Sequence, residues 1–201
     1  QLTLDSNGCR TVYDGPFDKG ELMIRTPLDK AYVRRTLREL YSHSASTAKD
    51  ELLDPAWDRS VDIFPGMGVT SFASAASGAS NLVTLPNAAG DIITGLIGVY
   101  IAPTYGIDEV RDQGINAVPV WVLSPGSEFE VLAPAFDSAL AWTFPTDGTE
   151  LLVTVMHTGA NRGKLVPSGT ANSTTKPVAR AIRRPATDVL VIAGLNAGAA
   201  Y

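Results

Sequence analysis

The runs VPVWVL (118–123) and EFEVL (128–132) open a series of short apolar segments that decides the fold of this 201-residue chain. The series continues with ALAWTF (139–144), ELLVTVMH (150–157), VARAIRR (178–184) and DVLVI (188–192). Each run mixes β-branched and aromatic residues with period-two alternation, and Pro, Gly, Asp or Ser bounds it. This texture predicts one short β-strand after another and therefore a compact β-domain.

The segment that precedes this series supports the same prediction. Between residues 61 and 102, glycines separate short apolar runs such as NLVTL (81–85) and DIITGLIGVYIA (91–102). We therefore expect residues 61–192 to form one β-rich unit of eight or more short strands, folded as a small β-barrel or β-sandwich. The fold class is mainly β.

Residues 1–60 are predicted to form an N-terminal arm or subdomain that contains a short α-helix. Thr26-Pro27-Leu28-Asp29 is typical of a helix start, with a Thr cap and a proline at the first helical position. An apolar face with helical spacing follows at Tyr32, Val33, Leu37, Leu40 and Tyr41. A second short helix is predicted over residues 49–53, before Pro55.

These segments divide the chain into an arm (1–60), a β-rich domain (61–192) and a tail (193–201). The tail is rich in Gly and Ala, carries no charge, and is expected to be flexible or to dock on a neighbour. If the arm is separate, a chain that begins near Asp58 is expected to fold cooperatively.

The charge is low and unevenly distributed. Charged residues make up 18% of the chain, below the usual quarter, which suits a surface partly covered by a partner. Residues 61–160 hold ten acidic residues and one basic residue, Arg111, whereas residues 161–201 hold six basic residues and one acidic residue, Asp188. Since an acidic middle repels phosphate, no nucleic-acid partner is expected. The opposite patches are expected to meet within or between subunits. The apolar runs are shorter than a membrane span, so no membrane partner is expected either.

The chain has few residues that could carry chemistry. It contains two histidines, His43 and His157, and one cysteine, Cys9. His157 follows a predicted strand with no triad-like motif nearby, which favours a structural histidine at a strand end. His43 lies in a Ser-rich segment and is expected to be exposed, and the spacing of the two histidines fits no metal motif. We therefore predict no catalytic residue, no cofactor-binding residue, no metal ligand, no cofactor and no enzymatic activity.

Four other motifs have ordinary structural interpretations. Alternation places Glu128 and Glu130 on one face of a strand, as a solvent face rather than a glycosidase pair. Gly66-Met67-Gly68 lacks the residues of a phosphate loop and is interpreted as a turn. Asn172-Ser173-Thr174 matches a glycosylation sequon without a secretion signal. Arg183-Arg184-Pro185 is interpreted as a strand end with ion pairs at its rim.

Large aromatic residues recur along the predicted strands, at Trp121, Phe129, Phe136, Trp142 and Phe144. Their faces could bind sugar rings, but alternating aromatics are what a small β-core needs. We predict that Trp121, Phe129 and Trp142 are mainly core residues.

The block GINAVPVWVLSPGSEFEVLAPAFD (114–137) resembles a segment of head proteins of tailed phages. The shared features, in order, are Asn116, Trp121, Pro125-Gly126, Phe129, Val131 and Ala133-Pro134-Ala135-Phe136-Asp137. Pro65-Gly66-Met67, VTLPNAAG (83–90), GLIG (95–98) and TKPVARAI (175–182) are similar in style, so the resemblance covers about residues 60–192.

The resemblance implies a head decoration, or cement, protein: a small β-rich module on the outer surface of an icosahedral capsid. Its partners would be the major capsid protein and further copies of itself, as a homotrimer, and its role would be to bridge and stabilise shell subunits. The protein would be made in the host cytoplasm and located in the virion. Alternatives are another structural part of a phage, such as a head-fibre base or tail component, or a carbohydrate-binding β-module.

Overall fold

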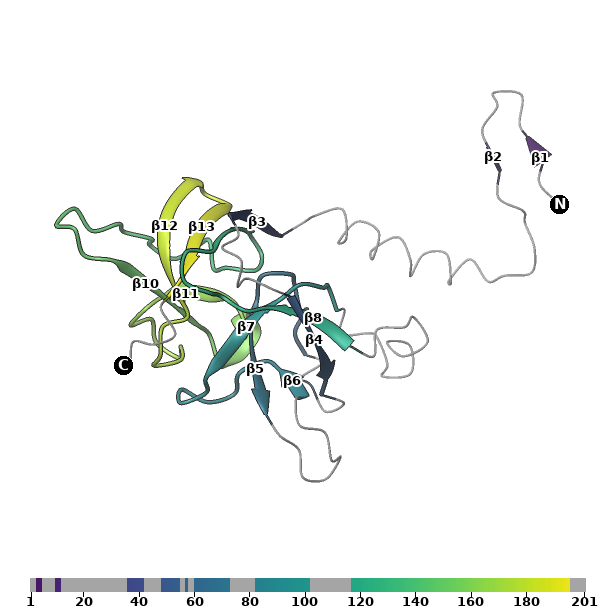
Figure 1. The fold of residues 1–201 in the computed structure, drawn as a ribbon, viewed down its shortest axis with the longest axis horizontal. Coiled ribbons are helices and arrows are strands. Elements are labelled where there is room, and N and C mark those ends of the chain that lie inside the picture. Colours follow the sequence, from purple (N-terminus) through teal and green to yellow (C-terminus); the bar gives the residue numbers. More distant parts are fainter. Residues whose placement is uncertain are drawn as a thin grey trace. The chain divides into compact units, whose positions relative to one another are not determined.

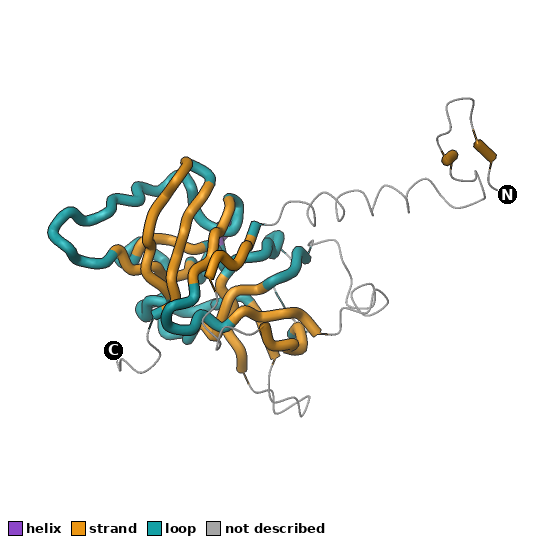
Figure 2. The backbone as a smooth tube through the Cα atoms, turned by 45° about the horizontal axis from the view of Figure 1, so that its top comes forward, coloured by secondary structure: helices purple, strands orange, loops and turns teal. Residues whose placement is uncertain are grey.

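The computed structural model describes residues 3–4, 10–11, 36–41, 48–54, 57, 60–72, 82–101 and 117–195 (Figures 1 and 2). The chain divides into two compact units, residues 1–34 and residues 35–201. In the first unit, strand β1 (Thr3–Leu4) pairs antiparallel with β2 (Arg10–Thr11).

Five strands of the second unit close into a barrel. They are β4 (Ala48–Leu53), β5 (Gly68–Phe72), β6 (Leu82–Thr84), β7 (Ile93–Ile97) and β8 (Ala117–Trp121). The order around the barrel is β4-β6-β5-β7-β8, and β8 pairs with β4 over the whole length from Ala48 opposite Trp121 to Leu52 opposite Ala117. β4 and β6 run parallel, and the other neighbours run antiparallel.

Six strands form an open sheet in the order β11-β10-β12-β13-β9-β3. They are β3 (Leu37–Tyr41), β9 (Glu128–Leu132), β10 (Leu151–Val155), β11 (Leu165–Pro167), β12 (Ala179–Ala186) and β13 (Val189–Gly194). A short 3-10 helix, η1 (Gly159–Asn161), lies in the connection from β10 to β11. β13 is central and buried on both faces, which explains its unbroken apolar run VLVIAG.

The barrel and the sheet share one hydrophobic core. Its buried members come from both, including Val69, Val118 and Val120 of the barrel and Phe129 and Ile192 of the sheet. Backbone bonds cross the junction, since the Gly68 amide donates to the Gly163 carbonyl at 2.8 Å. The two strand assemblies therefore form one packed body rather than two domains.

The predicted mainly β fold is confirmed, and it contains a closed barrel. The predicted helices are wrong wherever the structure describes them. Residues 37–41 form β3, which pairs with β9, and residues 49–53 lie within β4, which closes the barrel against β8. Residues 27–35 of the first predicted helix lie outside the described residues.

The pairing of β3 and β4 also changes the predicted division of the chain at residue 60. Both strands precede that residue, yet both are hydrogen-bonded into the β-rich unit. The compact units separate between residues 34 and 35 instead. A separate N-terminal arm is thus retained as a proposal for residues 1–34 alone. Residues 196–201 of the predicted tail lie outside the described residues, and its first two residues belong to β13.

One predicted strand is absent. ALAWTF (139–144) follows β9 as irregular chain, although its side chains still alternate: Leu140, Trp142 and Phe144 face inward and Ala141 and Thr143 are exposed. Extended chain with one apolar side satisfies the period-two pattern without a ladder partner. The alternation of ALAWTF (139–144) therefore correctly predicts which of its side chains are buried, but the prediction that the segment pairs with another strand is wrong.

Candidate functional site

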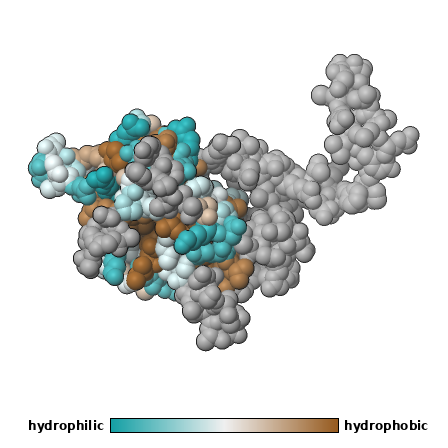
Figure 3. All heavy atoms as spheres, in the orientation of Figure 1, coloured by the Kyte–Doolittle hydropathy of each residue, from teal (hydrophilic) through white to brown (hydrophobic). Residues whose placement is uncertain are grey.

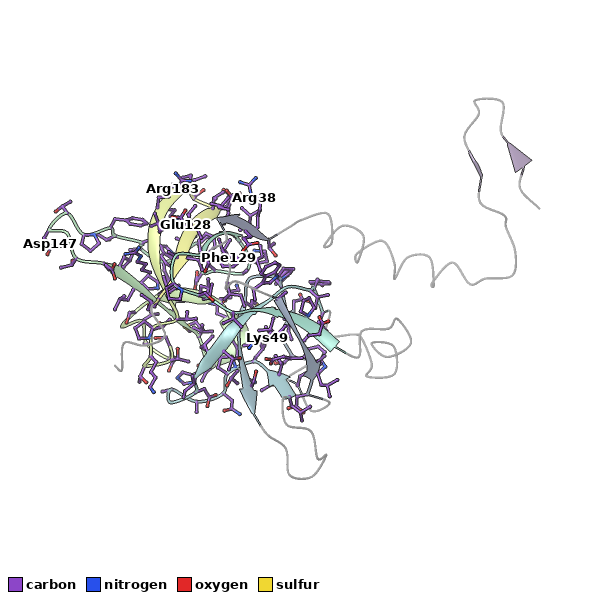
Figure 4. All side chains as sticks on the ribbon, viewed as in Figure 1. Arg38, Lys49, Glu128, Phe129, Asp147 and Arg183 are labelled. Carbon is purple, nitrogen blue, oxygen red and sulfur yellow. The ribbon has the colours of Figure 1, made fainter. Side chains whose placement is uncertain are left out.

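The most prominent exposed feature of the described β-unit is the connection from β9 to β10. We call residues 138–150 the projecting loop. It extends away from β10 and β12 in both ribbon views (Figures 1 and 2), and Asp147 lies at its far end (Figure 4). A connection of this length with no regular structure is uncommon in a compact domain and is usually functional or disordered.

The base of the projecting loop is fixed by two buried aromatic rings. Phe136 and Trp142 are 1% and 7% exposed and meet edge to face, with ring centroids 5.7 Å apart. The Trp142 indole nitrogen donates to the Asp137 carbonyl at 2.9 Å. Asn161 donates through its side-chain amide to the Asp137 carboxylate at 3.0 Å. The loop therefore leaves the body from an anchored position.

Two arginines of β12 hold the two arms of the loop. Arg184 donates to the Ser138 carbonyl at 2.8 Å and also to the Thr187 carbonyl, while its guanidinium lies 5.8 Å from the centre of the Phe136 ring. Arg180 forms an ion pair with Glu150, where the chain returns to β10. Both arms are thus joined to one strand of the sheet.

The tip of the loop, residues 145–150, is exposed throughout. The Asp147 carboxylate oxygen Oδ1 accepts hydrogen bonds from the Thr149 hydroxyl at 2.6 Å and from the Thr149 amide at 3.0 Å. These two bonds, the hydroxyl bond first, hold the pKa of Asp147 below its usual value. Gly148 has φ +84°, a conformation that glycine adopts without strain. The tip is a preformed turn that carries an ionised carboxylate at neutral pH.

Elsewhere on the described surface, large apolar side chains are exposed singly. They are Leu52 on β4, Ile92 before β7 and Ile182 on β12, with exposed fractions of 46%, 59% and 37%. On the coloured part of the face in Figure 3, brown hydrophobic atoms lie in small groups among teal hydrophilic ones. Isolated exposed apolar side chains are ordinary on protein surfaces and do not define a binding patch.

Comparison with known proteins decides the family. The family model described as phage cement protein matches residues 23–199, most of the chain and all of the sheet and barrel. The chain belongs to the phage cement protein family. A chain from a solved structure titled "The capsid of Myoviridae Phage XM1" is similar to it with a TM-score of 0.46 and 15% identity, over 78% of this chain and 88% of that chain. No curated protein matches it.

Membership of this family makes the protein a structural component of a phage capsid, and its location is therefore the virion. The suspected relationship to head decoration proteins is confirmed. No helix among the described residues has the length and apolar character needed to cross a membrane.

The two carboxylates considered above as a possible glycosidase pair, Glu128 and Glu130, have a structural role in this cement protein. Glu128 and Glu130 lie on one face of β9 and are half-buried, while Phe129 between them is completely buried on the other face. Glu130 forms an ion pair of 3.0 Å with Arg38 of β3, the strand that pairs with β9. The predicted placement of both carboxylates on one face of the strand is confirmed, but that face is half-buried rather than open to solvent.

The structure describes one of the two histidines, His157. His157 follows the end of β10, and its amide donates to the Asn172 carbonyl at 3.0 Å. His43 and Cys9 lie outside the described residues. Among the described residues, no group of three or more His, Cys, Asp or Glu side chains could hold a metal ion.

Gly66-Met67-Gly68 forms a packing turn, as predicted. Gly66 has φ +99°, and its amide donates to the Ile97 carbonyl at 2.8 Å. A Cβ atom on Gly68 would lie 2.4 Å from a methyl carbon of Val155, so this glycine allows the barrel to approach the sheet. The three residues therefore have a structural role, because they form part of the contact between the barrel and the sheet.

Thr174 of the sequon and Arg184 of the arginine pair contribute to the fold, and no described ion pair involves Arg183 or Arg184. Thr174 of the sequon is 2% exposed, and its hydroxyl accepts a hydrogen bond from the Val155 amide. Arg183 and Arg184 lie inside β12 rather than at its end. The ion pair of Arg180 with Glu150 is one instance in which the predicted basic and acidic segments meet within the chain.

Of the aromatic candidates, Phe129, Phe136 and Trp142 are buried, and Trp121 and Phe144 are half-buried against the core. Trp121 packs edge to face on Phe129, with centroids 5.9 Å apart. The core prediction is confirmed for Phe129 and Trp142 and holds in part for Trp121. The burial of Phe129, Phe136 and Trp142 removes these three rings as a platform for sugars.

The sequence does not predict the projecting loop, because the alternation of ALAWTF (139–144) favours a strand there. The signal that could have identified it is the following PTDGTE (145–150). Pro, Asp, Gly and Thr in this order are typical of a turn, and the six residues contain no large apolar side chain.

Proposed function

We propose that this cement protein binds the outer surface of the capsid and bridges neighbouring major capsid subunits, which stabilises the shell. The family match over residues 23–199 carries this proposal. The packed junction of barrel and sheet supports it, because a bridge resists the separation of two subunits only if it does not itself deform.

The proposed assembly is a homotrimer at three-fold or quasi-three-fold positions of the shell. A trimer meets several shell subunits at once, so each contact can be weak while the second and third attachments become effectively intramolecular. Surface ion pairs contribute little individually and weaken with salt. Buried apolar contacts would therefore supply most of the binding free energy.

The proposed role of the protein is purely structural. The protein would be made in the host cytoplasm and would bind to the assembled shell from outside. Packaged DNA presses outward on the shell and separates its subunits. A rigid element attached to two or more of them raises the free energy of opening. No reaction is required of the protein for this role.

The test compares particles that carry the protein with particles that lack it. We expect particles without the protein to release DNA at a lower temperature and to recover when the purified chain is added back, measured by DNA-dye fluorescence during heating. Light scattering of the free protein should give three times the mass of the chain. Equal DNA release with and without the protein would contradict cementing, and a monomer at all concentrations would contradict the trimer.

A further inference from the structure

The projecting loop combines a fixed base with an exposed end of which the fold uses only Glu150, in its ion pair with Arg180. Its base is held by Phe136, Trp142 and the two arginines of β12 described above. Residues 145–150 are exposed and project away from the sheet (Figures 1 and 4). The protein thus positions six residues rigidly in solvent.

The tip is also pre-organised for binding. Thr149 closes the turn on Asp147, and Gly148 occupies the left-handed conformation that the turn requires. A segment that already has its bound shape loses little conformational freedom when it docks, so more of its contact free energy appears as affinity.

The charge of the tip indicates the chemistry of its partner. The charge of Glu150 is offset by Arg180, whereas Asp147 has no cationic neighbour among the described ion pairs. Both hydrogen bonds to Asp147 end on Oδ1, which leaves Oδ2 for an external donor. An arginine or lysine on the partner would match this carboxylate.

The size of the tip favours the shell over a second copy of the chain. A stable interface buries about 800 Å² on each partner, formed by some 20–30 residues. Six residues fall well short of this and cannot hold two free copies together. On a shell, by contrast, several small contacts made by one oligomer reinforce each other.

We propose that residues 145–150 are a docking element that inserts into a basic recess of a major capsid subunit, with Asp147 as its central contact. This inference rests on the proposed function. It adds to that function the segment of the chain that contacts the shell and the basic character of the capsid surface that this segment binds.

The experiment measures binding of the purified full chain to particles that lack it. Asp147→Lys reverses the tip charge and Asp147→Asn removes it, while Asp188→Lys makes the same reversal at the exposed turn between β12 and β13. We expect Asp147→Lys to weaken binding by about tenfold or more, Asp147→Asn to weaken it less, and Asp188→Lys to stay within about twofold of the wild type. Unchanged thermal unfolding of each variant shows that folding is preserved.

A photo-cross-linking residue in place of Thr146 identifies the occupant directly. Cross-links to the major capsid protein are the expected result. Cross-links to a second copy in the absence of particles, or equal binding by Asp147→Lys and the wild type, would overturn the docking element while the cementing role stands. Absence of binding by the wild type would instead overturn the proposed function and this inference together.

Discussion

At the scale of single residues, burial in this protein follows the period of the strand. β9 alternates half-buried and buried residues along Glu128–Leu132, and its central Phe129 is completely enclosed. Phe129 contacts Trp121 of β8 and so joins the sheet to the barrel. One aromatic side chain therefore contributes to the packing of both strand assemblies.

Phe129→Ala should lower the free energy of unfolding by about 3–5 kcal/mol, because it removes a large buried ring and leaves a cavity between sheet and barrel. Ile92→Ala is the matched control: Ile92 is largely exposed, and its truncation should change stability by about 0.5 kcal/mol or less. Urea denaturation followed by tryptophan fluorescence measures both variants. A midpoint for Phe129→Ala close to that of Ile92→Ala would show that the ring is not part of a close-packed core.

At the scale of elements, the connection from η1 to β11 fastens the sheet to the end of β6. Arg162 donates through Nε to the Pro86 carbonyl at 2.6 Å and through Nη2 to the Leu85 carbonyl at 2.9 Å. The next residue, Gly163, has φ +88°, and a Cβ atom there would lie 2.6 Å from a methyl carbon of Leu85. The arginine and the glycine together allow two loops distant in sequence to pack at one junction.

The substitution Arg162→Met keeps an unbranched aliphatic side chain but removes the guanidinium group. The carbonyl groups of Leu85 and Pro86 then lose their charged hydrogen-bond donor in a partly buried position. We expect a loss of about 2–3 kcal/mol in unfolding free energy. Lys176→Met provides the control, because Lys176 is an exposed cation in a neighbouring loop. Differential scanning calorimetry should separate the two variants by several degrees. Equal melting temperatures would mean that the two hydrogen bonds contribute nothing net to the junction.

At the scale of the whole molecule, the β-unit is closed by strands from its N-terminal side. β4 completes the barrel between β6 and β8, and β3 covers β9 at one edge of the sheet. Both come from the part of the sequence that local patterns assign to an arm. The folding unit therefore extends further toward the N-terminus than the strand-rich sequence suggests.

A chain that begins at residue 35 should fold cooperatively, whereas one that begins at Asp58 should not. The shorter chain lacks β3 and β4, so β8 and β6 lose a hydrogen-bonded neighbour and the barrel stays open. Denaturant titration with circular dichroism measures the cooperativity of each. A sharp, reversible transition of the chain that begins at Asp58 would restore the original division at residue 60.

The sequence by itself determined the β class, the burial of Phe129 and Trp142, and the turn at Gly66-Met67-Gly68. These depend on short-range patterns: alternation along a strand and the conformational needs of glycine at a turn. The resemblance of residues 114–137 to phage head proteins also indicates the family to which the chain belongs.

Only the tertiary structure decided that LRELY (37–41) and AKDELL (48–53) are strands and that ALAWTF (139–144) is not. The first two contain good helix formers at helical spacing, but β9 and β8 offer them ladder partners about 90 and 70 residues away. The third has strand alternation but no strand beside it, and Trp142 holds it instead by packing on Phe136. A strand exists only where a partner backbone lies alongside, so its identity depends on contacts that no local sequence pattern contains.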